Sequence, residues 1–254
     1  MMKISVITVT YNAGEVLQAT IDSVMEQGYD NVEHIIIDGA STDETMAMSR
    51  EYARRLKAVG SPYEVVIQSE PDSGLYYAMN KGLFRATGDY VVFLNAGDRF
   101  ASPDTLTIVA EAAGSDVKTG VVYGDTVIVD IDNNILRPRH KDAPEKLSWR
   151  SFKDGMVVCH QAFFALREIA KDVPYDTDYR YSADVDWCIR VMKAAEDRGM
   201  SLVNTHSVLC HFLDNGMSQK HKGKSLRERY SIMSDHYGTL SAVSSHLSFL
   251  RQRV

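Results

Sequence analysis

The stretch VVFLNAGD, residues 91–98, begins with four apolar residues and ends on an amide, two small residues and a carboxylate. An apolar run of this kind is typical of a buried strand, and the polar residues mark where that strand ends. Two earlier runs end in the same manner, since KISVITVT (Lys3–Thr10) leads into Tyr-Asn and VEHIIID closes on Asp38. Turn formation explains any one such ending, but three in succession favour a ligand site at the carboxyl edge of a parallel sheet.

Segments with helical spacing lie between these strands. Gly14–Gln27 repeats apolar residues at helical intervals, and Ser41–Leu56 opens with Ser-Thr-Asp-Glu, which is typical of a helix N-terminus. The chain continues with YEVVIQS as a strand, Gly74–Ala86 as a helix, DYVVFL as a strand and a further helix after Ser102-Pro103. This alternation predicts βαβ units, and therefore an α/β fold with a Rossmann-like, mainly parallel sheet flanked by helices.

The alternation changes after Gly120. VVYGDTVIVDIDNNILRPR (residues 121–139) carries an Asn133-Asn134 turn between β-rich flanks, which predicts a hairpin rather than another βα unit. Ser182–Gly199 then reads as a helix closed by glycine, and a C-terminal helical segment follows it. A second region is therefore expected to extend the sheet.

Composition limits the class of protein. The chain has 254 residues, of which 44% are hydrophobic and 24% charged, and this suits one large α/β domain. The formal net charge is -6, with the acidic excess in the first half, which argues against nucleic acid as the main partner. Three cysteines without CxxC spacing predict neither a disulfide framework nor a zinc ribbon, so we expect a reducing cytoplasm. No run approaches the ~18 apolar residues of a membrane span, so we expect a soluble protein or one peripheral to the inner face of the membrane.

Two absent motifs narrow the ways in which the chain would hold a phosphate group. No G-x-G-x-x-G follows the first strand, and no G-x-x-x-x-G-K-[ST] occurs in the chain, so dinucleotide and P-loop sites lose their main support. A carboxylate at a strand end suits a hard divalent cation, which takes oxygen ligands and neutralises a diphosphate. The strand-end carboxylates are therefore candidate metal ligands.

Four segments together carry a resemblance to a known family. ISVITVTYN (4–12), IIIDGASTD (35–43), SEPDSGLYYAMNKGLFRATGDYVVFLNAGD (69–98) and ADVDW (183–187) stand in the order seen in family 2 glycosyltransferases, which have the GT-A fold. The resemblance extends from Lys3 to Gly216, and the combination is far more specific than any single motif. It implies inverting transfer of a sugar from a nucleotide-diphosphate sugar, with a UDP-sugar favoured, to a glycan or lipid-linked acceptor in surface polysaccharide biosynthesis.

The resemblance implies a donor site along the strand ends. Tyr11 and Asn12 would lie beside the nucleotide base. Asp38 would accept hydrogen bonds from a uracil-type edge or from the ribose. The full set of implied donor-binding residues is Thr10, Tyr11, Asn12, Asp38, Asp72, Gly74, Asn80, Asn95 and Lys222.

Two further segments are implied to close over the donor. The turn Asp72–Gly74 would help to close the nucleotide pocket. The basic run QKHKGKSLRER (219–229), which holds Lys222, would form a loop over the diphosphate and a surface that approaches anionic lipids, where a lipid-linked acceptor would lie. A solvated helix face is the plainer interpretation of this run, and both interpretations stay open.

The opening stretch departs from the family pattern. Asn95–Asp98 occupies the place of the family's metal-binding Asp-x-Asp, but only the last carboxylate is kept. Metal affinity should therefore rest on Asp98, the diphosphate oxygens and water. His211 resembles a late metal or diphosphate contact and suits Mn²⁺ better than Mg²⁺. Met79 stands where many relatives have arginine, which removes one cationic contact to the nucleotide.

The catalytic candidates lie in the second half. SADVDWCIR matches the family's Glu-Asp motif with Ala183 in place of the glutamate, so Asp184 would be the catalytic base and Asp186 a supporting carboxylate. Capping of the following helix is the structural alternative for Asp184, and the two roles are compatible. CHQAFF resembles the acceptor-side segment and places His160 and Gln161 near the sugar or acceptor, with a structural role for the histidine equally open.

The combined expectation is an enzyme, an inverting hexosyltransferase that uses Mn²⁺ or Mg²⁺. Residues 1–118 would bind the nucleotide sugar, and residues 119–254 would supply the acceptor site and base, in one continuous domain. A non-catalytic nucleotide-sugar-binding protein remains the alternative because the metal motif is reduced. A sugar-phosphate nucleotidyltransferase is less favoured, because the first turn, Thr-Tyr-Asn-Ala-Gly, offers no cation. Base, sugar and acceptor depend on pocket shape, which the sequence does not specify.

Overall fold

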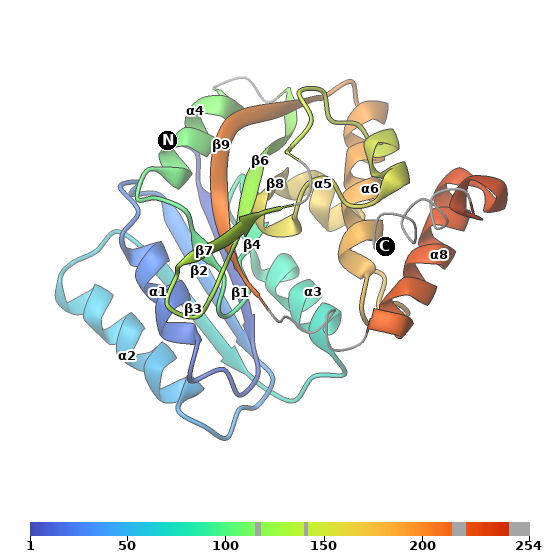
Figure 1. Cartoon of the computed structure of the whole chain (residues 1–254). Helices are drawn as coiled ribbons and strands as arrows, with labels where there is room; N and C mark the ends of the chain where they lie inside the picture. Colours follow the sequence, from blue (N-terminus) through green and yellow to red (C-terminus); the bar gives the residue numbers. More distant parts are fainter. Residues whose placement is uncertain (115–117, 140–141, 215–221, 244–254) are drawn as a thin grey trace.

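The computed structural model describes residues 1–114, 118–139, 142–214 and 222–243. Its strands are β1 (Ile4–Thr10), β2 (Val32–Asp38), β3 (Glu64–Ser69), β4 (Tyr90–Phe93), β5 (Arg99–Phe100), β6 (Thr119–Val129), β7 (Ile135–Pro138), β8 (Phe163–Leu166) and β9 (Ser201–Leu213). They form one sheet in the order β3-β2-β1-β4-β8-β6-β9-β5, and β7 pairs with β6 (Figure 1).

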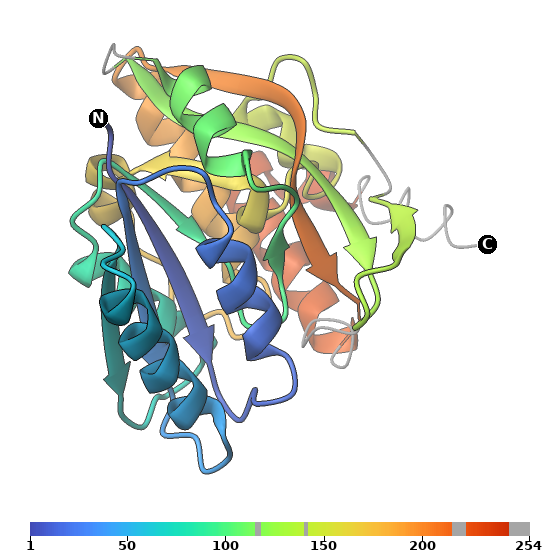
Figure 2. The same cartoon turned by 90° about the vertical axis from the view of Figure 1, so that its left-hand side faces the viewer.

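Helices cover both faces of this sheet. They are α1 (Leu17–Met25), α2 (Thr45–Ala58), α3 (Leu75–Arg85), α4 (Thr105–Ala113), α5 (Arg167–Asp172), α6 (Ala183–Asp197) and α8 (Lys222–Tyr237), with the 3-10 helices η1 (Trp149–Asp154) and η2 (His160–Ala162). Helices α1, α2 and α4 lie on one face (Figure 2), whereas α3, α5 and α6 lie on the other. Helix α8 packs against α6 at the edge of the molecule.

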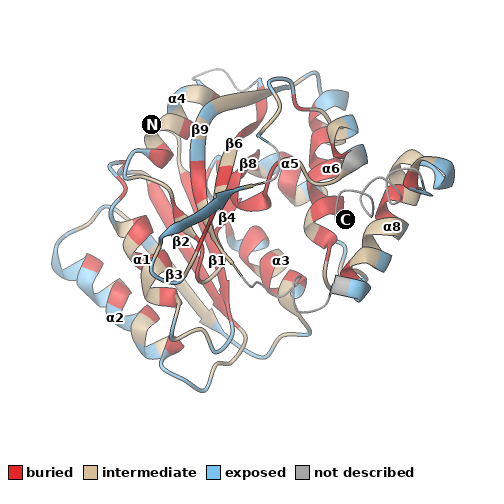
Figure 3. Cartoon of the chain, in the orientation of Figure 1, coloured by how far each residue is buried: buried red, intermediate tan, exposed pale blue. Residues whose placement is uncertain are grey.

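The central strands are buried on both faces. Strand β1 pairs in parallel with β2 and β4, and every residue of β1 and β2 is buried. In β2, Ile36 packs with Leu17 and Ile21 of α1, while Ile35 and Ile37 belong to the larger core, as the alternation of side chains along a strand requires. The red central strands and the pale blue β7 in Figure 3 show this contrast between core and edge.

The sequence predicted the first half of the fold better than the second. The α/β fold with a mainly parallel sheet is confirmed, and the predicted hairpin is formed by β6 and β7, with Asn133 at a φ of 67° in the turn. Strands β8 and β9 were not predicted. Strand β9 contains the polar residues 204–207 and has His206 at a φ of 53°, and its register against β6 shifts there, so its sequence lacks the regular pattern of a strand.

One sheet joins the two predicted regions. Strand β4 pairs with β8, and β8 pairs with β6, so the sheet continues across residue 118. The division of the chain there stays a prediction. In the described ranges, no helix has the length and apolar character that crossing a membrane requires. Cys159, Cys188 and Cys210 are free thiols, and all three are buried.

Candidate active site

The polar strand ends lie together at the carboxyl edge of the sheet. Thr10 at the end of β1 lies opposite Asp38 at the end of β2. The backbone N–H of Ala96 donates to the carbonyl oxygen of Val9 at 3.4 Å, which brings the turn after β4 beside the end of β1. The edge expected from the sequence is therefore observed.

Asp38 and Asn12 hold the loop that follows β2. One carboxylate oxygen of the fully buried Asp38 accepts hydrogen bonds from the Ser41 backbone N–H (2.9 Å) and the Ser69 hydroxyl (2.6 Å), and the other accepts from the Ser41 hydroxyl. Asn12 has a φ of 47°, and its Oδ1 accepts from the backbone N–H of Thr42 at 2.9 Å. Both side chains therefore fix the conformation of this loop.

Tyr11 and the turn before α3 flank this loop. The Tyr11 side chain is among the exposed large residues, with 67% of the residue exposed, and a Cβ added at Gly39 would lie 3.3 Å from its ring. Asp72 accepts a hydrogen bond from Lys81, and Gly74 directly precedes α3. The ring of Tyr11 thus presents an open aromatic face next to the Asp72–Gly74 turn.

Three buried oxygens at this edge have no hydrogen-bond partner among the described residues. They are Thr10 Oγ1, Asp72 Oδ2 and Asn95 Oδ1. A buried polar atom without a partner costs about 1–3 kcal/mol, so such atoms are uncommon in folded proteins. Hydroxyl or N–H groups of a ligand would satisfy these oxygens. The edge therefore has the chemistry of a binding site.

Asn80 has a different environment from the other implied donor-binding residues. Its side-chain amide donates to the carbonyl oxygen of Tyr175 (2.9 Å) and its Oδ1 accepts from the backbone N–H of Tyr175 (2.8 Å). Both functional groups of the amide are therefore used to hold the segment that precedes α6. Met79, which replaces the arginine of many relatives, is fully buried in the core.

Asp98 ends the NAGD turn in a buried position, with 5% of the residue exposed. Its Oδ2 accepts from Gln161 Nε2 (2.8 Å), and its Oδ1 accepts from the backbone N–H of Leu213 (3.1 Å). Burial raises the pKa of Asp98 to about 6, although these two hydrogen bonds and the charge of His160 act in the opposite direction. Gly97 has a φ of 99°, and a Cβ there would lie 2.7 Å from Leu213, so β9 approaches closely because this residue is glycine.

Few described side chains are placed to hold a metal. Within residues 1–114, 118–139, 142–214 and 222–243, no group of three His, Cys, Asp or Glu residues is arranged to bind one. His211 pairs with Arg99 across two strands, and its Nδ1 lies 2.9 Å from Asn133 Oδ1. Burial and then the Arg99 charge lower the pKa of His211. Asn95 Oδ1 is buried without a hydrogen-bond partner among the described residues, whereas both carboxylate oxygens of Asp98 accept hydrogen bonds from the protein.

A series of hydrogen-bonding contacts connects the NAGD turn to α6. Asn95 Nδ2 lies 3.3 Å from His160 Nε2, and His160 Nδ1 lies 3.3 Å from Asp184 Oδ2. The Tyr76 hydroxyl donates to Asp184 Oδ1 at 3.2 Å. Burial raises the pKa of Asp184, but the contact with His160, the charge of Arg229 and the Tyr76 hydroxyl outweigh it, so the pKa is lowered from its ordinary value. Asp184 is therefore an ionised carboxylate at neutral pH, with 18% of its side chain exposed.

The comparison with known families decides the class of enzyme. Residues 5–173 match the model described as glycosyl transferase family 2. This chain belongs to glycosyl transferase family 2. The matched segment contains the strand ends, the NAGD turn and His160, whereas Asp184 lies beyond it.

Relatives of this glycosyltransferase agree with that assignment. It is 35% identical over 217 residues to an uncharacterized glycosyltransferase of Mycobacterium tuberculosis, covering 84% of this chain and 76% of the relative. It is 34% identical over 187 residues to a PGL/p-HBAD biosynthesis glycosyltransferase of Mycobacterium bovis, covering 73% and 68%. The chain is therefore an enzyme of the glycosyltransferase class.

Solved structures confirm the GT-A fold. The structure of Staphylococcus aureus TarS 1–349 in complex with UDP-GlcNAc superposes on this chain with a TM-score of 0.70 at 15% sequence identity. The superposition covers 98% of this chain and 73% of the TarS chain. The mannosyltransferase PcManGT of Pyrobaculum calidifontis, in complex with GDP-Man and Mn²⁺, gives a TM-score of 0.62 at 17% identity, covering 97% and 74%.

Asp186 of the glycosyltransferase faces α8 rather than the network around Asp184. Its carboxylate accepts from Arg190 Nε (2.6 Å), and its other oxygen lies 2.8 Å from His236 Nε2. The contact with His236 joins α6 to α8, whereas Arg190 lies on α6 itself. The side chain of Lys222 is outside the described part of the chain, as are residues 219–221 of the basic run, although Lys222 begins α8.

Sequence reasoning missed three residues of the site. Tyr76 contacts Asp184, Arg229 lies close enough to lower the pKa of Asp184, and Glu228 binds the segment before α6. The only sequence signals were the position of Tyr76 in the family-like segment and of the other two in the basic run.

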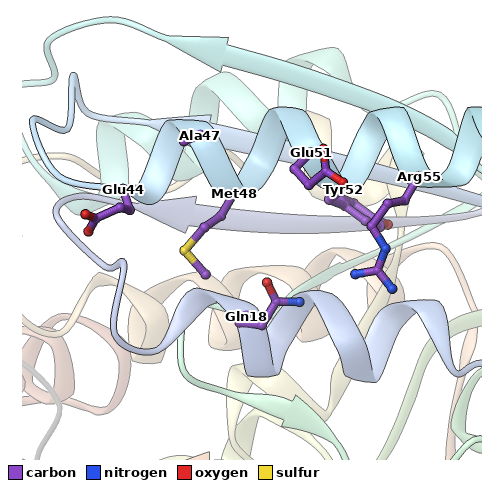
Figure 4. A pocket seen from close by; sticks show the side chains of 7 residues that line it. All are labelled: Gln18, Glu44, Ala47, Met48, Glu51, Tyr52 and Arg55. Carbon is purple, nitrogen blue, oxygen red and sulfur yellow. The ribbon is translucent and has the colours of Figure 1, made fainter.

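Two pockets of the glycosyltransferase are lined by residues other than Asn95, His160, Tyr76 and Asp184. One, of about 260 Å³, lies between α1 and α2 (Figure 4), and none of the described residues that line it is a predicted site residue. The other, of about 370 Å³, is lined by Ile131, Leu136 and Leu213 with two aspartates, beside the β6–β7 hairpin. Leu213 connects the second pocket to the NAGD turn, because its backbone N–H binds Asp98.

Proposed function

We propose that this glycosyltransferase moves a sugar from a nucleotide-diphosphate sugar to an acceptor hydroxyl, with inversion at the anomeric carbon. The observation that carries the proposal is the contact series Asn95–His160–Asp184, which joins the strand-end edge to an ionised, partly exposed carboxylate. A donor bound along the edge and an acceptor beside Asp184 would be held in reacting position by one connected set of side chains.

The donor nucleotide would bind along the ends of β1 and β2 and the start of α3. The exposed ring of Tyr11 offers a face for the base, and the free oxygens of Thr10 and Asp72 would accept hydrogen bonds from the base or ribose. We assign Asp38 to holding the loop through Ser41. A UDP-sugar is favoured by the family resemblance, with support from the TarS complex, and the GDP-Man complex of PcManGT keeps GDP as the next candidate.

A divalent cation would be held by Asp98 and Asn95 together with the donor diphosphate. When bound, it would supply positive charge that stabilises the departing nucleoside diphosphate. His211 and Lys222 are further candidates for contacts to the diphosphate, as the resemblance implies. PcManGT was solved with Mn²⁺, which supports the choice of metal.

Asp184 would act as the general base. The acceptor oxygen forms a bond to the anomeric carbon as the bond from that carbon to the diphosphate oxygen breaks, and the acceptor proton moves to the Asp184 carboxylate. His160 and Tyr76 would orient this carboxylate, since each contacts one of its oxygens. A single displacement of this kind inverts the configuration.

The acceptor is proposed to be a glycan or lipid-linked intermediate of a surface polysaccharide. The relative from Mycobacterium bovis is named for PGL/p-HBAD biosynthesis, and a relative from Erwinia amylovora is named for amylovoran biosynthesis. Lys224 and Arg227 of α8, a helix that packs against α6, are exposed and would attract an anionic acceptor or lipid surface.

A non-catalytic nucleotide-sugar sensor is the second candidate. The observation in its favour is that both oxygens of Asp98 already accept hydrogen bonds from the protein. A sensor would bind the donor without turning it over.

Donor binding and turnover together test the proposal. We would measure melting temperature with UDP-, GDP- and dTDP-sugars, with and without Mn²⁺, because a ligand of the folded state raises its stability. Release of nucleoside diphosphate from the stabilising donor would then be followed with water as the acceptor. Slow, Mn²⁺-dependent hydrolysis that is lost in Asp184→Asn is expected. Binding without any turnover supports the sensor, and failure of every donor to bind overturns both functions.

A further inference from the structure

The three residues directly before α6, the helix that carries Asp184, are held by one carboxylate of helix α8. Glu228 of α8 accepts hydrogen bonds from the backbone N–H groups of Arg180 (2.9 Å), Tyr181 (2.8 Å) and Ser182 (3.0 Å). Hydrogen bonds to an ionised acceptor are roughly twice as strong as neutral ones. Three consecutive N–H groups directed at one anion therefore fix the path of the chain into α6.

A serine pair strengthens the same junction. The Ser182 hydroxyl lies 2.9 Å from the hydroxyl of Ser225, and both residues are buried. Ser182 occupies the N-cap position of α6, but its side chain does not cap the helix, because it bonds to α8 instead. The start of α6 is consequently positioned by α8 rather than by its own N-cap.

We infer that Glu228 is a positioning residue for catalysis, which fixes the first turn of α6 and thereby the orientation of Asp184; this inference rests on the proposed role of Asp184 as base. Asp184 lies two residues after Ser182, at the second position of the helix. Its contacts with Tyr76 and His160 are 3.2 and 3.3 Å long, so a small shift of the helix start would break them. Arg229, the neighbour of Glu228, adds a positive charge near the same carboxylate.

The inference predicts a loss of turnover without a matching loss of donor affinity. A displacement of a reacting group by about 1 Å can cost on the order of 100-fold in rate. We expect Glu228→Ala to lower kcat for donor hydrolysis by roughly 10- to 100-fold, with the KM for the donor nearly unchanged, because Glu228 binds the backbone of residues 180–182, which are not among the proposed donor-binding residues. Glu228→Gln keeps the side-chain volume and one acceptor oxygen, so its kcat should lie between those of Glu228→Ala and the wild type.

Glu196→Ala is the matched control. Glu196 lies at the far end of α6, where its exposed carboxylate is 3.4 Å from Arg150. The Glu196→Ala variant removes a glutamate ion pair of the same helix but leaves the first turn of α6 unchanged. Its kcat should therefore equal that of the wild type.

A double-variant experiment decides whether Glu228 acts through Asp184. Hydrolysis of the donor that raises the melting temperature most would be measured for Asp184→Asn, Glu228→Ala and the combination, beside a melting curve for each protein. If Glu228 only orients Asp184, adding Glu228→Ala to Asp184→Asn causes no further loss. Multiplied losses, or a folded Glu228→Gln and Glu228→Ala pair with wild-type kcat, would overturn the inference. Wild-type turnover in Asp184→Asn alone would instead remove the base assignment, so the two failures are distinguishable.

Discussion

The donor half and the catalytic half of the candidate site are built in different ways. In the donor half, the residues that matter end neighbouring strands, and the polar side chains mostly hold their own loops, as Asp38 and Asn12 do. In the catalytic half, Asp184 is surrounded by Tyr76, His160 and Arg229, which come from three other parts of the chain.

Residues of the donor half are placed by the order of the strands, whereas residues of the catalytic half are placed by the packing of helices. Parallel strands bring their carboxyl ends together whatever the helices do, so Thr10 and Asp38 meet by register alone. Asp184 and Tyr76 are 108 residues apart, and their contact depends on the packing of α3, α6 and α8. A substitution in the catalytic half should therefore affect rate more than one in the donor half, which should affect binding or stability.

The largest expected effect is that of Asp184→Asn. Asparagine keeps the size of aspartate and a side-chain oxygen that can accept from Tyr76, but it cannot take up the acceptor proton, so turnover should fall on the order of 10²- to 10⁴-fold with folding intact. Asp186→Asn is the matched change on the same helix and should lower the melting temperature more than the rate, because Asp186 binds Arg190 and His236. Rates at saturating donor and melting curves check both. Equal losses of rate in the two variants would contradict the assignment of Asp184, rather than Asp186, as the base.

Asp98, which lies between the two halves, should control the effect of metal. We expect Asp98→Ala to weaken donor binding in Mn²⁺ by roughly 10- to 100-fold, a range typical of lost support for a bound metal, and to leave metal-free binding nearly unchanged. Asn95→Ala should weaken donor binding with or without metal, because its free Oδ1 and its contact with His160 are both removed. Calorimetric titration with and without Mn²⁺ measures these effects. Equal enhancement by Mn²⁺ in Asp98→Ala and the wild type would contradict the assignment.

The core beneath the donor half should make the fold sensitive to acid. Burial lowers the pKa of His34 from 6.5 to about 3, and its ring nitrogens contact Thr8 (2.9 Å) and Tyr52 (3.0 Å). The unfolded chain binds a proton at this histidine below about pH 6.5, whereas the folded chain does so only near pH 3, so stability is lost as pH falls through that window. At pH 5 the loss relative to pH 7.5 should be about 2 kcal/mol.

Denaturant unfolding of His34→Gln at the two pH values tests this expectation. The stability gap between wild type and His34→Gln should shrink by about 2 kcal/mol from pH 7.5 to pH 5. Tyr52→Phe removes a hydroxyl that contacts the ring but keeps the imidazole, so it should keep the wild-type pH dependence. A gap that does not change with pH would show that His34 is not the cause.

The smallest effects are expected at two residues that the family resemblance implies for donor binding, Asn80 and Tyr11. Asn80→Ala removes both hydrogen bonds to Tyr175 and should cost about 1–3 kcal/mol of stability, with little change in donor affinity per folded molecule. Tyr11→Ala removes an exposed ring and should weaken nucleotide binding at nearly constant stability. Melting curves and calorimetry on the two variants check the pair. The opposite pattern would mean that Asn80 contacts the nucleotide directly.

The donor half was the more predictable from sequence, because short-range patterns determine it. Apolar runs with polar ends located β1, β2 and β4, and their parallel order placed Thr10, Asp38 and Asn95 at one edge. The environments of side chains within that half were not predictable. Nothing in the sequence indicates that Asn80 binds the backbone of a residue 95 positions away or that His211 pairs with Asn133.

The catalytic half was predictable only as a set of candidates. The family-like motif singled out Asp184 as the base, and the structure brings it together with His160. The same motif implied Asp186 as a supporting carboxylate, whereas its oxygens contact Arg190 and His236. Glu228 was hidden in a run that reads as a basic surface. Its role depends on the approach of α8 to the start of α6, a contact between helices that local periodicity does not encode.

The three buried thiols make the site observable without any substrate. Cys159 directly precedes η2, Cys188 lies on α6 and Cys210 lies on β9, so each reports on a different element around the site. Burial raises the pKa of all three thiols, which slows their reaction with alkylating reagents in the closed protein. The labelling rate of each cysteine, followed by mass spectrometry, therefore reports how readily the helix or strand beside that cysteine opens. If a bound donor slows the labelling of Cys159 and Cys210 more than that of Cys188, it reduces the opening of η2 and β9 more than the opening of α6.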